Sequence, residues 1–124
     1  MKRSVLFVSA LLICITPLGF AQKSQKDLEN KDLARIAKLE KGVIVARKAF
    51  FKSSKDAKLK KDLLTKEFVL AEDILVCQAM PSKERYPRAL RLYREIIILD
   101  PKHKKAHERI GLIEGIYKSM NRPI

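Results

Sequence analysis

Residues 89–111 read ALRLYREIIILDPKHKKAHERIG, and this stretch decides the fold. Its first half places large apolar residues at steps of three and four, which is the period of an amphipathic helix. Asp100-Pro101 interrupts the pattern, because proline has no amide hydrogen to continue a helix. The pattern resumes at Ala106 and continues past Gly111. The stretch therefore predicts two helices joined by a short turn, and helices joined in this way run antiparallel.

Two further helices are predicted before this stretch, because apolar residues recur there with the same period. Ser53-Ser54-Lys55-Asp56 separates the two, and its serines can accept a hydrogen bond from a free amide of the second helix. Pro81 ends that second helix, and Pro87 is expected in the first turn of the third, where proline is tolerated. The prediction is an all-α fold of four antiparallel helices, at about residues 27–52, 56–80, 86–99 and 104–120.

The core is predicted along one apolar stripe of each helix. In the first helix the stripe comprises Leu28, Ile36, Leu39, Val43, Ala46 and Phe50. In the second helix it comprises Leu59, Leu63, Glu67, Leu70, Ile74 and Cys77. Cys77 is therefore expected to be a packing residue. Gly42 lies inside the first helix at a cost of about 1 kcal/mol relative to alanine, and a close helix crossing would explain its presence.

The first 21 residues have the pattern of a secretory signal. Lys2 and Arg3 give a positive start, residues 5–15 are apolar apart from one serine, and Gly19-Phe20-Ala21 offers small residues for cleavage. We expect cleavage after Ala21 and export to the periplasm or the medium, with an uncleaved membrane anchor as the alternative. The rest of the chain divides into an N-terminal helical segment, a C-terminal helical part and a tail, at residues 22–69, 70–120 and 121–124.

The chain is strongly basic, with 27 lysine and arginine residues against 14 aspartate and glutamate residues. Most of the excess positive charge lies in residues 22–61. Such a charge attracts acidic protein segments, anionic membrane surfaces or anionic envelope polymers. Nucleic acid is not expected as a partner, because Phe50 and Phe51 are the only aromatic residues of this basic half, and bound bases stack on aromatic side chains.

The stretch from Ala89 to Gly111 resembles the tetratricopeptide repeat, a helix–turn–helix unit of about 34 residues. Ala89 and Tyr93 match its second helix, Pro101 matches its exit turn, and Ile110-Gly111 matches the first helix of the following unit. The resemblance covers residues 70–120 and implies one complete unit followed by a single further helix. Small residues at Ala89 and Gly111 are expected to let helices approach closely, with Tyr93 filling the space between units.

This resemblance implies a non-enzymatic adaptor or scaffold that binds another protein in the bacterial envelope. Ligands of the family lie in a groove lined by the first helix of each unit, which corresponds here to Gln78, Lys105, Arg109 and Leu112. Lys105 and Arg109 lie one turn apart and are expected to receive a carboxylate from an acidic partner segment. The alternative function is that of a basic helical protein bound to an anionic membrane surface or envelope polymer.

The last predicted helix has no partner helix of its own. One interpretation is that the first two helices cover its apolar face. The other is that this face is open for a second copy of the chain, giving a homodimer, or for a different protein, since exposed apolar patches mark binding surfaces.

The sequence has no residue pattern of an active site. His103 and His107 lie four residues apart, which can begin a metal site, but no third ligand completes it at a recognisable spacing. We expect His103 at a turn and His107 at a packing position. Since the chain also has no nucleophile–histidine–acid set and no glycine-rich phosphate loop, we predict no metal, no cofactor and no enzymatic activity.

Overall fold

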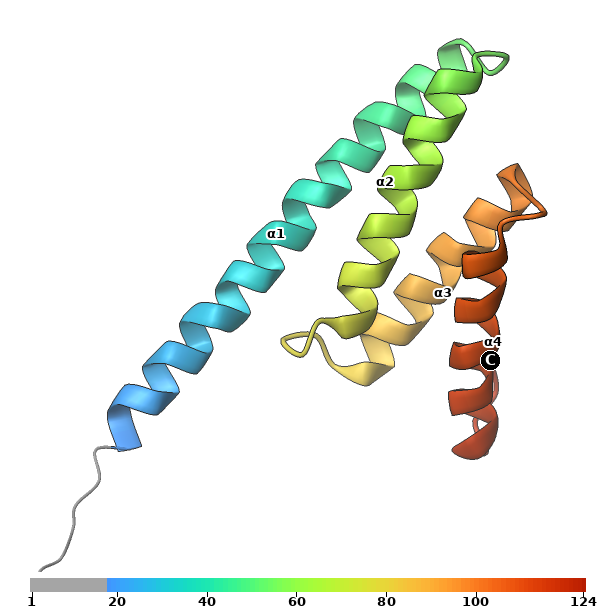
Figure 1. Ribbon diagram of the computed structural model, residues 1–124. Helices are drawn as coiled ribbons and strands as arrows, with labels where there is room; N and C mark the ends of the chain where they lie inside the picture. The colour runs from blue at the N-terminus through green and yellow to red at the C-terminus, as the bar shows by residue number, and fades with distance from the viewer. Residues whose placement is uncertain (1–17) are drawn as a thin grey trace, which may run out of the picture.

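The computed structural model describes residues 18–124, with side chains from residue 24 onward. This range contains no strand and folds as α1 (Leu18–Lys52), α2 (Ala57–Val76), α3 (Ser82–Leu99) and α4 (Lys104–Ser119). Consecutive helices run in opposite directions, as Figure 1 shows, so the predicted all-α fold of four helices is confirmed. Residues 1–17 of the predicted signal lie outside the described part of the chain. The last four residues of that signal, 18–21, belong to α1.

The helix boundaries differ from the predicted ones at three places. α1 begins at Leu18 instead of near residue 27, because residues 20–31 contain no proline or glycine that would end a helix. α2 ends at Val76 instead of near Met80, and the amide of Met80 instead closes a turn on the carbonyl of Cys77. Pro81 does not by itself account for this early end, because proline disfavours helical geometry only in the residue directly before it, Met80.

α3 begins at Ser82, four residues before the predicted start. The carbonyl of Pro81 accepts hydrogen bonds from the amides of Glu84 and Arg85, at 2.9 and 3.0 Å, so Pro81 is the residue on which the helix starts. Pro87 consequently lies in the second turn and not in the first. It is exposed there, so the backbone carbonyl that loses its helical partner is near solvent.

The core runs along α2, which packs against α1 on one side and α3 on the other. The largest fully buried apolar side chains are Tyr93, Leu63, Ile74, Ile96 and Ile113, and burying one such side chain stabilises the fold by about 1.5–3 kcal/mol. Cys77 is buried, which confirms it as a packing residue, and Glu67 is buried on the predicted stripe. Leu28 was placed on the core stripe by its spacing, but it is exposed because α1 extends there beyond its contact with α2.

Neither Gly42 nor Gly111 lies at a close helix crossing. A Cβ atom added at either position would meet no atom of a neighbouring element within 4 Å. The close approaches expected at these two glycines are therefore wrong, and other residues bring the helices together. Ala89 and Ala106 are fully buried and fill that role at the α3 and α4 interfaces.

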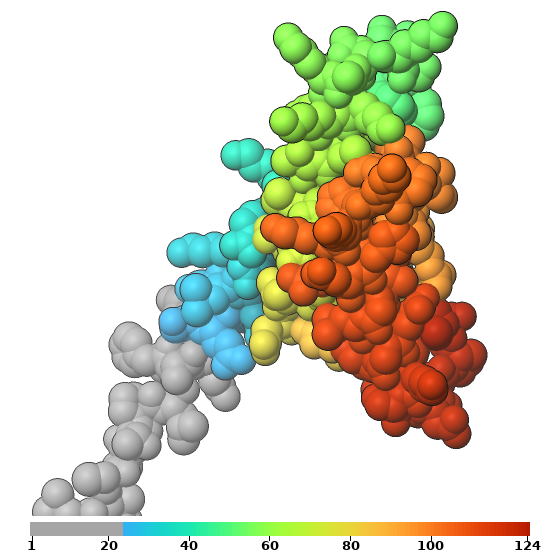
Figure 2. All heavy atoms as spheres, turned by 45° about the vertical axis from the view of Figure 1, so that its right-hand side comes forward, coloured from blue at the N-terminus to red at the C-terminus, as the bar shows by residue number. Residues whose placement is uncertain are grey.

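Ion pairs also connect alternate helices. Arg47 and Arg88 join α1 to α3 through Glu95 and Glu40, and Arg109 joins α4 to α2. Long arginine side chains thus reach from α1 and α4 to helices that are not their neighbours in sequence, whereas the close packing is between consecutive helices. In the space-filling view of Figure 2, the turn between α1 and α2 projects beyond the C-terminal pair of helices. None of the helices from Leu18 onward is long and apolar enough to cross a membrane.

Candidate functional site

Three of the four predicted site residues lie on one stripe of α4. Lys105, Arg109 and Leu112 follow one another at intervals of four and three residues, which places them on the same helix face. Lys105 and Leu112 are exposed, and Arg109 is partly buried. Gln78 belongs to a different element, because it lies exposed in the turn that follows α2. The predicted site is therefore a stripe of α4 with one outlying residue.

Arg109 is already paired within the chain. Its Nε and Nη2 atoms donate to the two carboxylate oxygens of Glu72 on α2, at 2.7 and 2.9 Å. A guanidinium group bound to both oxygens of a carboxylate is held in a fixed orientation. The carboxylate expected from a partner is thus supplied at Arg109 by α2. Lys105, one turn before Arg109, is the cation of this stripe that is exposed to an incoming segment.

Glu72 also accepts a hydrogen bond from the hydroxyl of Tyr93, at 2.5 Å. The hydrogen bond from Arg109 lowers the pKa of Glu72, and the bond from Tyr93 and the charge of Lys105 act in the same direction. Burial raises the pKa of Tyr93, and the negative charge of Glu72 raises it further. At neutral pH the cluster therefore consists of a carboxylate, a guanidinium ion and a neutral phenol. It has no proton to exchange in the neutral range, so its role is to fix α4 against α2 and α3.

The sequence contains a signal for this pairing that spacing alone makes visible. Glu72 precedes Arg109 by 37 residues. The predicted repeat length of about 34 residues plus one helical turn of about 3.6 residues gives a similar separation. The helical period does not predict this pairing, because it connects residues of two different helices.

The two histidines have structural contacts. His103 begins α4, where its Nδ1 atom accepts a hydrogen bond from the amide of Ala106 at 3.2 Å, and its ring packs on Phe68. This confirms its place at a turn. His107 is exposed, with Nε2 2.8 Å from the carbonyl oxygen of Pro101, so the expected packing position is wrong. From residue 24 onward, no group of three His, Cys, Asp or Glu residues is arranged to hold a metal ion.

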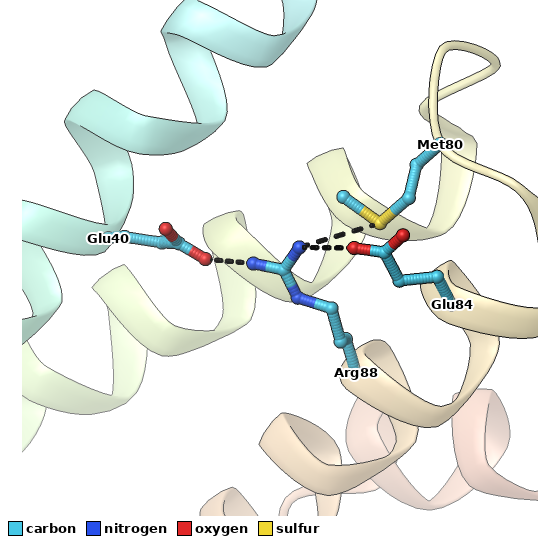
Figure 3. A network of polar contacts seen from close by, with 4 residues as sticks. All are labelled: Glu40, Met80, Glu84 and Arg88. Carbon is cyan, nitrogen blue, oxygen red and sulfur yellow. Dashed lines mark hydrogen bonds and ion pairs between the residues drawn. The ribbon is translucent and has the colours of Figure 1, made fainter.

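A second set of polar contacts fixes α1. Arg88 of α3 pairs with Glu40 of α1 and with Glu84 of its own helix, and it also contacts the sulfur of Met80, as Figure 3 shows. Seven residues after Glu40 along α1, Arg47 donates to both Glu67 and Glu95, at 2.6 Å each. Ion pairs at two positions about two helical turns apart along α1, Glu40 and Arg47, thus fix α1 to the other helices.

Glu67 is the buried member of these contacts. Its Oε1 atom accepts the hydrogen bond from Arg47, whereas its buried Oε2 atom has no hydrogen-bond partner among the described residues. Burial raises the pKa of Glu67, and the hydrogen bond from Arg47 opposes that rise. The hydrogen bond from Arg47 therefore favours the charged carboxylate at this buried position, where burial alone favours the uncharged acid.

A hollow of about 490 Å³ lies beside α3 and the C-terminal residues. Its apolar lining includes Leu90 and Ile98 of α3, Tyr117 of α4 and Ile124. The hollow lies on the side of α3 and α4 where the C-terminal residues pack.

Compared with protein-family models, curated proteins and solved structures, the chain matches none of them.

Proposed function

We propose that the protein is a non-enzymatic docking module that binds a segment of another protein along α4. The observation that carries this proposal is the exposed stripe of Lys105 and Leu112, with Arg109 held between them by Glu72. A fixed scaffold that presents one cation and one apolar side chain loses little conformational entropy on binding. The segment that fits it has an acidic residue opposite Lys105 and an apolar residue opposite Leu112, and Gln78 extends the surface toward the end of α2.

The open side of α4 supports the same proposal. Leu112 is 51% exposed, and Met120 at the end of the helix is exposed as well. Exposed apolar side chains on an uncovered helix are typical of binding surfaces. A second copy of the chain is the alternative occupant, which would give a homodimer through α4. We propose that the protein acts as a tetratricopeptide-like adaptor or scaffold in the periplasm or the medium, on the basis of the signal pattern predicted in its first 21 residues.

The pairing of Arg109 with Glu72 makes Arg109 unsuitable as a test residue for binding. Reversing the charge of Arg109 would place two carboxylates together and destabilise the fold, so loss of binding by that variant would have no clear meaning. Lys105→Glu acts on the exposed cation alone. Lys104→Glu is its matched control, because Lys104 is also exposed but points about 100° away around the helix.

The experiment places a photo-crosslinking amino acid at position 112 of the full-length chain in its native cells. We expect a crosslinked partner that is lost in the Lys105→Glu variant and retained in the Lys104→Glu variant. Equal loss in both variants would show general charge attraction and would overturn the proposed site. A crosslinked species of twice the chain mass that contains only this protein would identify a second copy as the occupant.

Attachment to an anionic surface is a second candidate function. It is favoured by the exposed lysines and exposed apolar side chains of α1, a helix separate from α4.

A further inference from the structure

α1 has apolar side chains both on and off its buried stripe. Ile36, Val43, Ala46 and Phe50 are buried against the rest of the fold. Off this stripe, Leu33, Ile44, Val45 and Phe51 are between 41% and 70% exposed, and Ile44 and Phe51 border hollows that α2 and α3 also line. A helix that only covers a core has polar residues opposite its buried stripe. The exposed apolar residues therefore need a different explanation from the packing of this chain.

The exposed apolar residues share their face with lysines. At about 100° per residue they lie within roughly one third of the helix circumference. We call this set the outer face of α1, and it comprises Leu33, Lys41, Ile44, Val45, Lys48, Phe51, Lys52 and Lys55, the last in the turn that follows the helix. All of these residues are exposed.

The outer face carries no carboxylate. Between residues 33 and 55 the only acidic residue is Glu40, which turns toward α3 and pairs there with Arg88. The four lysines of the outer face make no ion pair within the part of the chain whose side chains are described. Lysines and apolar side chains thus alternate along the helix, and no carboxylate of this face neutralises the lysines.

The position of α1 leaves this face accessible. Figure 1 shows α1 at the edge of the molecule, with α2, α3 and α4 all on one side of it. Side chains from the middle of α1 project from that edge in Figure 2. At about 1.5 Å per residue, the face from Leu33 to Phe51 is about 27 Å long. It is therefore long enough to lie along an extended surface.

We propose that the outer face of α1 lies on a membrane surface that contains anionic lipids. The apolar side chains enter the boundary between headgroups and acyl chains, and the lysines extend to the lipid phosphates with their aliphatic stems covering apolar surface. A flat anionic surface fits because lysines and exposed apolar side chains share one accessible face of α1. A nucleic acid or another polyanion would pair with the lysines but would leave Ile44, Val45 and Phe51 in water.

The test measures contact of this face with vesicles in the full-length chain. A fluorescent amino acid that reports local polarity replaces Val45, and in a matched chain it replaces Val76 of α2. Both valines are largely exposed, at 66% and 62%, but Val76 lies on a different helix. With vesicles of phosphatidylcholine and phosphatidylglycerol we expect a blue shift at position 45 and none at position 76. Vesicles of phosphatidylcholine alone should give no shift, because the lysines then have no anionic partner.

Two variants separate the charged and apolar contributions. Lys48→Gln with Lys52→Gln should raise the lipid concentration for half of the shift about 25-fold, at about fivefold for each lysine near an anionic surface. Phe51→Ala should raise it about tenfold, which corresponds to about 1.4 kcal/mol. The control Lys83→Gln with Lys118→Gln removes two exposed lysines of other helices and should leave it unchanged.

Four results would overturn the proposal. One is the absence of a shift at position 45 with anionic vesicles. A second is an equal shift with uncharged vesicles, which would show that the N-terminal residues alone bring the chain to the bilayer. A third is an equal effect of the control lysines. The fourth is full competition by soluble polyphosphate together with no effect of Phe51→Ala, which would identify a polyanion as the ligand.

Discussion

The buried carboxylate of Glu67 makes the stability of the fold depend on Arg47. Its side chain is only 2% exposed, and its single hydrogen bond comes from Arg47 at 2.6 Å. Replacing Arg47 with methionine keeps an aliphatic stem of similar length but leaves the carboxylate unpaired. Burial already raises the pKa of Glu67, and without the opposing hydrogen bond the pKa rises further. The group then takes up a proton in the folded state in place of remaining charged.

The cost of that proton sets the size of the effect. In the unfolded chain the pKa of Glu67 has its ordinary value of 4.5. Protonating this carboxylate at pH 7 therefore costs about 3 kcal/mol, at about 1.4 kcal/mol per pH unit. We therefore expect Arg47→Met to lower the free energy of unfolding by up to about 3 kcal/mol at pH 7, because the raised pKa of Glu67 in the native protein already includes part of this cost. Because the pKa of the folded state lies above that of the unfolded chain, the loss is small below pH 4.5 and grows as the pH rises toward the folded-state value.

Urea unfolding followed by circular dichroism at pH 7 and pH 4.5 measures this loss. Glu67→Gln is the control, because it removes the charge, keeps the size of the side chain and leaves Arg47 paired with Glu95. It should change the free energy of unfolding by less than about 1 kcal/mol at either pH. A loss below about 1 kcal/mol for Arg47→Met at pH 7, or equal losses for the two variants, would refute the dependence of a buried charge on Arg47.

Three further predictions concern local interactions. Glu72→Gln should lower the free energy of unfolding by about 1 kcal/mol, a modest value because both Glu72 and Arg109 are partly exposed. Since the pKa of Glu72 is lowered in the folded state, urea titrations should show this difference above about pH 4.5 and its loss as the pH falls through the folded-state value. Gly42→Ala should add about 0.5–1 kcal/mol, because the new Cβ meets no atom of a neighbouring element, and a lower thermal midpoint would contradict this. Asp56→Ala should cost about 1 kcal/mol by removing the acceptor for the amides of Lys58 and Leu59, whereas Asp56→Asn should retain most of the stability in the same assay.

The number, order and direction of the helices are predictable because their signals are local. Apolar residues at the helical period and the breaks at Ser53-Ser54-Lys55-Asp56 and Asp100-Pro101 are enough for this purpose. The end of α2 is not predictable in the same way. The carbonyl of Cys77 accepts a hydrogen bond from the guanidinium group of Arg85, at 3.1 Å, and this contact forms only after α3 has folded back.

The partners of the charged residues are the part of the site that local patterns miss. Lys105, Arg109 and Leu112 are found on one stripe because that statement needs only the helical period. The bond between Arg109 and Glu72 connects residues 37 positions apart, and that between Arg47 and Glu95 connects residues 48 apart. Such pairings depend on how the helices stack, so a charged residue expected to meet a partner can already be neutralised within the chain.

The outer face of α1 does have a local signal, in residues that the core pattern leaves over. Ile44, Val45 and Phe51 are apolar but do not fit the stripe of Val43, Ala46 and Phe50. An apolar residue off the core stripe keeps much of its surface in water after folding, so a second surface that covers it adds further stabilisation.

The two proposed surfaces can be tested independently, because they lie on different helices. Lys105 belongs to α4 and Phe51 to α1, and these helices form no substantial contact with each other. Lys105→Glu should therefore leave the vesicle response at position 45 unchanged, and Phe51→Ala should leave crosslinking at position 112 unchanged. If either variant removed both responses, the two surfaces would belong to a single assembly, in which a membrane-bound α1 is needed for α4 to meet its partner.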